Sequence, residues 1–255
     1  MRKFSFRRKL ESAGVMVVAV GAAGMIAANG PLMNPNEGAP MTRILAASVP
    51  EDGAVAQALG RDPVSWDIPN LEHAMVDKWI GRFTGNMKSS LETYIVRMDK
   101  YDDMIAAKAE ARGMPKDLVF LAMIESGGVA SAKSPVGARG LWQFMAPTAR
   151  EYGLTSNERL DPEKSTDAAL TYLAKLHDRF GSWYLAAAAY NVGQGRVAKE
   201  MKRATGSTKG TDADYYRIAS RLPQETRDYV PKMIAAARIA KDPAKYGFEP
   251  TLAVR

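Results

Sequence analysis

The residue of this chain best suited to acid–base chemistry is Glu125, which ends an apolar stretch of sequence. It follows Leu121 and Ile124 at helical spacing and stands just before a serine and two glycines. A carboxyl group at the C-terminal end of an apolar helix is partly desolvated, and the negative end of the helix dipole disfavours its ionised form. Both effects raise the pKa of the carboxyl group, as a general acid near neutral pH requires. On position alone the alternative is an ordinary exposed glutamate, because most helix-end glutamates are not catalytic.

A helix over about 115–126 is expected to carry this glutamate. Pro115 suits its first turn, and Gly127-Gly128 suits its end. Upstream, apolar residues recur at steps of three and four over more than 20 residues, which predicts one amphipathic helix that stops at Gly113. The residues of this stripe are Met87, Leu91, Tyr94, Ile95, Met98, Tyr101, Ile105 and Ala109.

The rest of the chain also has helical patterns. Residues 129–139 are expected to form a loop, after which the chain re-enters a helix near Gly140. Asp161-Pro162 supplies the N-cap and first residue of a helix that runs to Phe180 and closes at Gly181. Further helices are expected at 183–191, 215–221 and 223–240, with a loop over 205–214. The sequence has no period-2 strand pattern of useful length and no internal repeat, so the predicted fold class is all-α.

The composition excludes several classes of site. The 255 residues include no cysteine, which excludes thiol catalysis, cysteine-bound metals and disulfides. The two histidines, His73 and His177, lie in helical patterns, where packing is a more common role than metal binding or catalysis. Much of the net charge of +7 comes from residues 1–12, which hold five basic residues and one acidic residue. We therefore expect no nucleic-acid binding, which would concentrate Lys and Arg on one face.

The N-terminus has the pattern of an export signal. A basic start leads into residues 13–28, which carry no charge, and then into Asn29-Gly30-Pro31. This pattern is typical of a signal peptide within residues 1–30. An uncleaved anchor in the inner membrane is the alternative, although the apolar run is short for a span of about 20 residues. Either reading places the rest of the chain in the periplasm or cell envelope. Residues 31–65, rich in Pro, Gly and Ala, are expected to be a linker.

Three motifs follow one another along the chain. They are Glu-Ser-Gly-Gly from Glu125, Ser-Pro-Val-Gly-Ala-Arg-Gly-Leu-Trp-Gln-Phe-Met over 134–145, and Ala-Ala-Tyr-Asn-Val-Gly-Gln-Gly-Arg-Val over 188–197. Together they closely resemble the catalytic domain of the soluble lytic transglycosylases, a lysozyme-like family that cleaves peptidoglycan. Residues 142–145 and 222–231 look most like the membrane-bound D branch of this family. The resemblance covers about 66–240.

The resemblance implies a lysozyme-like helical catalytic domain over 115–240, with an additional N-terminal helical segment at 66–114 and a C-terminal tail at 241–255. It gives Glu125 the role of catalytic acid and base, and it implies that the hydroxyl of Tyr190 approaches this carboxyl group. The residues implied for the substrate site are Ser134, Gln143, Met145, Ala189, Tyr190, Asn191, Glu225 and Tyr229. From the residues alone, Met145 and Tyr229 could equally belong to the core, and Asn191 could cap a helix.

The resemblance also implies a reaction that uses one carboxyl group and no metal or cofactor, whereas ordinary glycosidases use two carboxylates. Glu125 would protonate the oxygen between N-acetylmuramic acid and N-acetylglucosamine, and the 2-acetamido group of the substrate would stabilise the developing charge. Glu125 would then take the proton of the C6 hydroxyl, giving a 1,6-anhydro product without consuming water. The implied partner is the peptidoglycan glycan strand. Larger D-branch members carry C-terminal glycan-binding repeats that this sequence lacks, so the catalytic domain itself is expected to hold the strand.

Two other functions stay open on the sequence. A goose-type lysozyme hydrolase would need a second carboxylate to activate water, and Glu225 or Asp161 could supply it. A non-catalytic peptidoglycan-binding protein would keep the binding residues, but it would have no need of an acid at Glu125.

Overall fold

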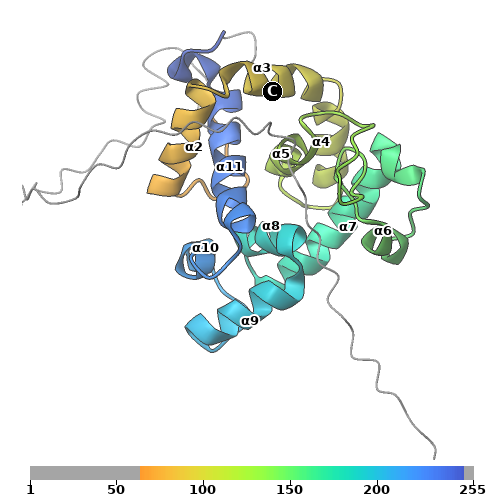
Figure 1. Ribbon diagram of the computed structural model, residues 1–255, viewed down its shortest axis with the longest axis vertical. Helices are drawn as coiled ribbons and strands as arrows, with labels where there is room; N and C mark the ends of the chain where they lie inside the picture. Colours follow the sequence, from red (N-terminus) through yellow and green to blue (C-terminus); the bar gives the residue numbers. More distant parts are fainter. Residues whose placement is uncertain (1–63, 250–255) are drawn as a thin grey trace, which may run out of the picture. The chain divides into compact units, whose positions relative to one another are not determined.

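The structure is a computed structural model that describes residues 64–249 (Figure 1). From Trp66 onward these residues form one compact unit built from helices. No β-strand occurs in this range; only isolated bridges join Arg139 to Lys133 and Phe144. The all-α prediction is therefore confirmed. The predicted signal or anchor at 1–30 and the linker, up to residue 63, lie outside the described residues.

The α-helices follow one another with short connections. They are α2 (Ala74–Thr84), α3 (Lys88–Met98), α4 (Asp102–Glu110), α5 (Val119–Ser126), α6 (Ala146–Glu151), α7 (Pro162–Phe180), α8 (Trp183–Val192), α9 (Gln194–Thr205), α10 (Asp212–Ala219) and α11 (Gln224–Lys241). Three 3-10 helices accompany them: η1 (Lys116–Leu118), η2 (Glu158–Leu160) and η3 (Pro243–Tyr246). None of the helices within 64–249 combines the length and the apolar character needed to cross a bilayer.

The long helix predicted over 87–109 is wrong in one respect, because it is two helices, α3 and α4. The chain turns between them, where the amide of Tyr101 donates to the carbonyl of Met98 at 2.7 Å. The acidic residues Asp102 and Asp103 favour a helix N-terminus and begin α4. The apolar stripe was nevertheless correct, since its Met98 and Ile105 side chains are fully buried on either side of the turn.

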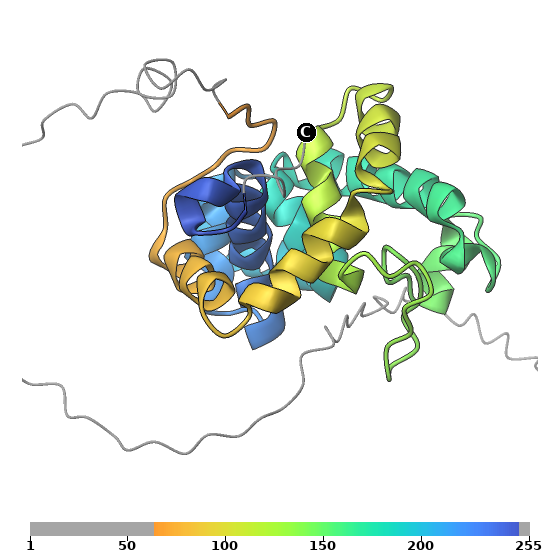
Figure 2. The same cartoon turned by 90° about the horizontal axis from the view of Figure 1, so that it is seen from above.

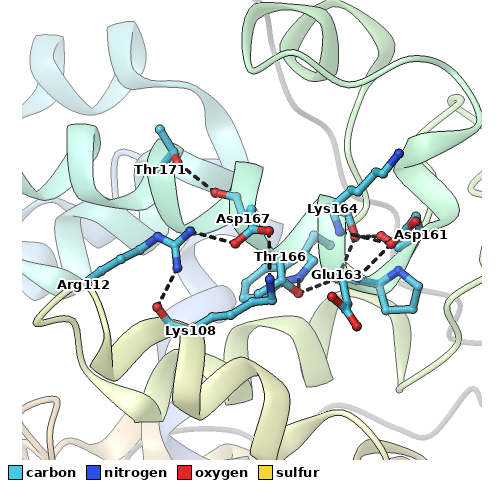
Figure 3. A network of polar contacts seen from close by, with 11 residues as sticks. Lys108, Arg112, Asp161, Glu163, Lys164, Thr166, Asp167 and Thr171 are labelled. Carbon is cyan, nitrogen blue, oxygen red and sulfur yellow. Dashed lines mark hydrogen bonds and ion pairs between the residues drawn. The ribbon is translucent and has the colours of Figure 1, made fainter.

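Helix α7 matches its prediction at both ends. Asp161 caps it by accepting hydrogen bonds from the amides of Glu163 and Lys164, at 2.9 and 3.0 Å. Gly181 closes it in the left-handed conformation, with φ of 71°. Figure 3 shows how α4 is tied to this helix, because Lys108 and Arg112 both bind the carboxylate of Asp167, and Thr171 donates to the Asp167 carbonyl.

The helix predicted near Gly140 is wrong, since the next helix, α6, begins only at Ala146. Residues 132–144 instead form a folded loop in which the Arg139 and Phe144 backbones exchange hydrogen bonds of 3.1 and 3.0 Å. The buried guanidinium of Arg159 holds this loop by donating to the carbonyls of Gly137 and Phe144. A Cβ atom at Gly140 would lie 1.7 Å from the Arg159 carbonyl oxygen, so glycine is required there.

The loop predicted over 205–214 is shorter than expected, because α10 starts at Asp212. Thr211 and Asp214 form a capping box that fixes this start. The alanine-rich helix α8 is buried along its length, including Ala186 and Ala189. Its small side chains let α7 and α11 approach from two sides.

Helix α11 packs against α2, α5 and α8 (Figure 1), and α2 lies beside it in Figure 2 as well. Pro231 stands inside α11 and has no amide hydrogen to give to the carbonyl of Arg227. The hydroxyl of Tyr215, from α10, replaces this donor, at 2.7 Å from the Arg227 oxygen and 3.0 Å from that of Thr226. A proline is thus accommodated in a buried helix by a tyrosine from its neighbour.

Candidate active site

Glu125 lies in the last turn of α5 and is buried, with 6% of its surface exposed. The helix stops at Gly127, which adopts φ of 59°, and Gly128 follows at 74°. A Cβ atom at Gly127 would lie 2.6 Å from the Tyr94 ring, and one at Gly128 would lie 2.6 Å from the Cβ of Arg97. The two glycines therefore let the end of α5 press against α3, which helps to bury the carboxyl group.

The two oxygens of Glu125 have different surroundings. Oε1 accepts a hydrogen bond from the hydroxyl of Tyr229 at 2.5 Å, whereas Oε2 is buried without a hydrogen-bond partner. Burial raises the pKa of Glu125 from 4.5 to about 8, while the hydrogen bond from Tyr229 and the charge of Lys232 oppose the rise. The carboxyl group is therefore mostly protonated at neutral pH, as predicted. Because the hydrogen bond from Tyr229 occupies Oε1, Oε2 is the oxygen that is available to carry the proton.

The resemblance implies that the hydroxyl of Tyr190 approaches Glu125, and in the structure this hydroxyl makes its hydrogen bond elsewhere. The hydroxyl of Tyr190 donates to the carbonyl of Trp142 at 2.8 Å, and its ring packs edge-on against Phe144. Tyr190 is still near the acid, since the charge of Glu125 contributes to the raised pKa of Tyr190. The hydrogen bond to the carboxyl group comes from Tyr229 on α11.

The loop at 132–145 places Gln143 under backbone strain. Gln143 has φ of 48°, and no other non-glycine residue in the described range has a positive φ. Such a conformation costs on the order of 1 kcal/mol or more and is common at functional sites. Its side-chain nitrogen donates to the carbonyls of Gly140 and Ala132, at 2.8 and 3.5 Å. These hydrogen bonds fix the orientation of the amide and leave its oxygen as the group able to accept a hydrogen bond.

Two other predicted residues of this loop lie at its edges. Ser134 is half-buried, and its hydroxyl accepts a hydrogen bond from the amide of Ala138 at 2.9 Å, which closes the turn between them. Met145 is half-buried at the N-cap of α6. Its side chain is absent from the set that packs on the hydrophobic core, so the core role that the sequence left open for Met145 is not favoured.

Asn191 joins α8 to the first turn of α11. Its side-chain oxygen accepts from the hydroxyl of Thr226 at 2.7 Å, and its nitrogen donates to a carboxyl oxygen of Glu225 at 3.2 Å. Asn191 is almost fully buried, whereas Glu225 is exposed to solvent. Partial burial still raises the pKa of Glu225, and the bond from Asn191 opposes this rise. Ala189, which precedes Tyr190 on α8, is fully buried beside this connection.

Sequence reasoning missed Lys232, which also belongs to this cluster. Its Nζ atom lies 3.4 Å from the carbonyl oxygen of Ile124 and 5.8 Å from the centre of the Trp79 ring. Lys232 shares a face of α11 with Glu225 and Tyr229, at steps of four and three residues. That spacing is visible in the sequence and could have indicated a third member of the face.

Other polar features of the described range lie apart from this cluster. His73 stacks on Tyr216 with ring centres 3.8 Å apart, and His177 stacks on Trp183 at 4.1 Å, so both histidines have packing roles. Residues 64–249 contain no group of three or more His, Asp or Glu side chains arranged to hold a metal ion. A hollow of about 740 Å³ is lined mainly by the connection at 112–116, together with residues of α7 and the first residue of α8, and it includes none of the predicted site residues.

The chain is similar to known proteins along most of its length. Residues 103–212 match the family model described as the transglycosylase SLT domain. Membrane-bound lytic murein transglycosylase D of Escherichia coli strain K12 is 36% identical over 205 residues, which cover 78% of this chain and 44% of that protein. Membrane-bound lytic murein transglycosylase F of Vibrio cholerae is 30% identical over 209 residues, which cover 69% and 38%. This chain thus spans less than half the length of these relatives.

A solved structure is similar too. The 70 kDa soluble lytic transglycosylase of Escherichia coli aligns over 79% of this chain and 41% of its own, with 20% identity and a TM-score of 0.49.

Glu125, the strained loop and Asn191 all fall within 103–212. The chain therefore carries a transglycosylase SLT domain, and it resembles the membrane-bound lytic murein transglycosylases, the D enzyme among them. Helix α11, with Glu225, Tyr229 and Lys232, follows the matched range.

Proposed function

We propose that this protein is a lytic transglycosylase of peptidoglycan. It cleaves the β-1,4 bond between N-acetylmuramic acid and N-acetylglucosamine without water and leaves 1,6-anhydromuramic acid ends. One observation carries the proposal: Glu125 is a buried acid whose pKa is raised to about 8 and whose Oε2 atom has no hydrogen-bond partner. Such a group is protonated at neutral pH and can donate from a fixed position.

The reaction uses the same carboxyl group twice. Glu125 gives the proton on Oε2 to the bridging oxygen, and the C1–O bond breaks with both electrons going to the leaving N-acetylglucosamine. The 2-acetamido oxygen of the muramic acid stabilises the positive charge at C1. The Glu125 carboxylate then accepts the proton of the C6 hydroxyl while the C6 oxygen bonds to C1. The acid is restored and no water is consumed. Tyr229 keeps Oε1 occupied throughout, so the proton leaves from and returns to Oε2.

Gln143, Asn191 and Ser134 are proposed to bind the sugar on either side of this bond, with Met145, Ala189 and Tyr190 shaping the same surface. The support for Gln143 is strongest, because its strained backbone and its anchored amide nitrogen turn a single acceptor oxygen toward a partner. A carbonyl acceptor of this kind matches the hydroxyl and N-acetyl N–H groups of the substrate.

A goose-type hydrolase is the second candidate, because it also starts from a protonated Glu125. It needs another carboxylate for water. Asp161 does not suit this role, since it caps α7. Glu225 suits it better, because Glu225 is exposed and lies near enough to Glu125 for its charge to raise the pKa of Glu125.

We place the protein in the cell envelope, where its substrate is. The basic and apolar pattern of residues 1–28 supports export, and residues 13–28 are proposed either to be removed with the signal or to attach the chain to the inner membrane. The names of the membrane-bound relatives agree with this location.

The test is mass analysis of products from purified sacculi incubated with the full chain. Anhydro-muramyl products, lighter by one water than hydrolysed ones, are expected from the wild type. Glu225→Gln should give the same anhydro products at a rate within about threefold, because Glu225 transfers no proton in the proposed reaction. Glu110→Gln, an exposed carboxyl group on α4, is the matched control. Hydrated reducing ends alone, lost on Glu225→Gln, would instead establish the hydrolase.

A further inference from the structure

Lys232 is a cation placed among the catalytic groups without an ion-pair partner. In the described part of the chain, no carboxylate oxygen lies within 4.0 Å of its ammonium group. The nearest acceptor is the carbonyl of Ile124, at 3.4 Å, which is too long for a strong hydrogen bond. An ammonium group partly removed from water with no carboxylate in contact needs an explanation.

The charges around Lys232 come from several elements. Glu125 on α5 and Glu225 on α11 both act on its ammonium group, while burial lowers the pKa of Lys232. The face of Trp79, from α2, lies on another side and attracts the cation. Tyr229 on α11 and Tyr190 on α8 are the other titratable groups beside Glu125, and both keep their protons because burial raises their pKa. Lys232 is therefore the one cation acting on both carboxyl groups in the described structure.

The proposed reaction creates a charge at this place. When Glu125 gives its proton away, it becomes a buried carboxylate whose only hydrogen bond comes from Tyr229. A buried anion without a countercharge is strongly disfavoured, which would raise the barrier to the first proton transfer. The ammonium group of Lys232, whose charge acts on Glu125 without an ion-pair contact, lowers that barrier and still leaves Oε2 free to receive the second proton.

We propose that Lys232 is a positioning residue that stabilises the Glu125 carboxylate formed during the reaction, acting through its charge and transferring no proton. The proposal rests on the proposed function of Glu125. Two contacts hold the ammonium group in place: one with the Ile124 carbonyl next to the acid, and one with the ring of Trp79 from a helix outside the matched family range. Helix α2 thereby contributes to the acid–base chemistry through its contact with Lys232.

The experiment compares Lys232→Met, Lys232→Gln and Lys232→Arg with the wild type in the full chain. The pKa of Glu125 is followed by ¹³C NMR of its side-chain carboxyl group, and turnover of sacculi is measured against pH. Without the positive charge, the pKa of Glu125 should rise by about one unit, so the alkaline limb of the pH–rate profile should move upward by the same amount. Turnover at the optimum should fall about tenfold with little change in KM, because the charge stabilises the carboxylate that develops as the proton leaves and not the bound substrate before reaction. Lys232→Arg, which keeps the positive charge, should have a Glu125 pKa and a turnover close to those of the wild type.

Lys199→Met, which removes an exposed lysine from α9, is the control and should change neither quantity. If Lys232→Met fails to fold, Lys232→Gln gives the same readout. If turnover fell at every pH while the pKa of Glu125 stayed the same, Lys232 would have only a packing role and the proposal would be overturned. A Lys232→Met variant with the turnover and Glu125 pKa of the wild type would overturn it as well. The NMR titration needs no turnover. If the wild type forms no anhydro products but the pKa shift occurs, the proposed function fails while the charge coupling stands.

Discussion

The candidate active site has two sides that are built in different ways. The first side, which we call the motif wall, consists of the end of α5, the loop at 129–145 and α8. The second side, which we call the α11 wall, consists of Glu225, Tyr229 and Lys232. The motif wall depends on backbone constraints: left-handed glycines, the strained Gln143 and the buried Arg159, which donates hydrogen bonds to two backbone carbonyls. The α11 wall depends on side chains spaced along one regular helix. The comparison indicates that the motif wall positions and buries the acid, which raises its pKa, whereas Tyr229 and Lys232 of the α11 wall lower that pKa.

The motif wall should give the largest effect when its acid is removed. Glu125→Gln keeps the size of the side chain but can neither give nor take the proton, so turnover should fall by on the order of a thousandfold. Binding to sacculi should remain close to that of the wild type, and the variant should unfold at no lower temperature than the wild type. Both are measured by co-sedimentation and circular dichroism. A variant that cleared sacculi at the parental rate would show that Glu125 has a structural role only.

The backbone of the motif wall can be tested with a pair of glycines. Gly140→Ala should destabilise the protein by more than about 2 kcal/mol, because the new Cβ atom would overlap the Arg159 carbonyl. Gly137→Ala is the matched variant, since Gly137 also has a positive φ but no atom within 4 Å of the new methyl group. It should cost only about 1 kcal/mol from backbone strain. Urea unfolding measures both, and equal losses would contradict the steric explanation.

The burial of Glu125 should also make stability depend on pH. Its pKa is about 8 when folded and near 4.5 when unfolded, so the folded state binds more protons between these values. Stability should therefore fall as pH rises from about 4.5 to about 8, by up to about 1.4 kcal/mol per pH unit from this one group. Glu125→Gln should remove that part of the slope and gain stability relative to the wild type toward pH 8. Parallel pH dependence in the two proteins, measured by urea unfolding, would show that Glu125 is not desolvated in solution.

The smallest of these effects should come from the hydroxyl of the α11 wall. Tyr229→Phe removes the hydrogen bond that holds down the pKa of Glu125, so that pKa should rise and the alkaline limb of the pH–rate profile should move upward. Turnover should fall about tenfold, because a single hydrogen bond to a developing carboxylate is lost. Tyr190→Phe, whose hydroxyl bonds to Trp142 instead, should leave the limb in place. If Tyr190→Phe moved the limb and Tyr229→Phe did not, the hydroxyl that adjusts the pKa of Glu125 would belong to the motif wall.

The parts of the fold that local signals specify could be predicted from the sequence. The ends of α7 follow from Asp161 and Gly181, and the buried stripe at 87–109 follows from its spacing. The turn at Tyr101 could not be predicted, because the stripe keeps its phase through it. The loop after Gly140 could not be predicted either, since a long-range contact from Arg159 holds it.

The same distinction applies to the site. The position of Glu125 at the end of an apolar helix suggests a raised pKa but leaves an exposed glutamate as the alternative, and the motifs around it are needed to single it out. The choice between Tyr190 and Tyr229 could not be made, since it depends on how α11 lies against α5 and α8. Lys232 was missed for a related reason: a lysine on a helix is normally exposed, and only the packing of Trp79 and Ile124 around it brings this one to the acid.

The proline within α11 has a consequence for how this protein can change over evolution. Pro231 lies between Tyr229 and Lys232 and leaves the carbonyl of Arg227 without its usual amide donor. The hydroxyl of Tyr215, from α10, donates to that carbonyl instead. Replacing Tyr215 alone leaves the carbonyl of Arg227 without a hydrogen-bond donor. Replacing Pro231 alone restores a backbone amide that competes with the Tyr215 hydroxyl for the same carbonyl. The two positions therefore form a compensating pair, and a lineage that drifts at one of them is expected to adjust the other, although neither side chain is proposed to touch the sugar.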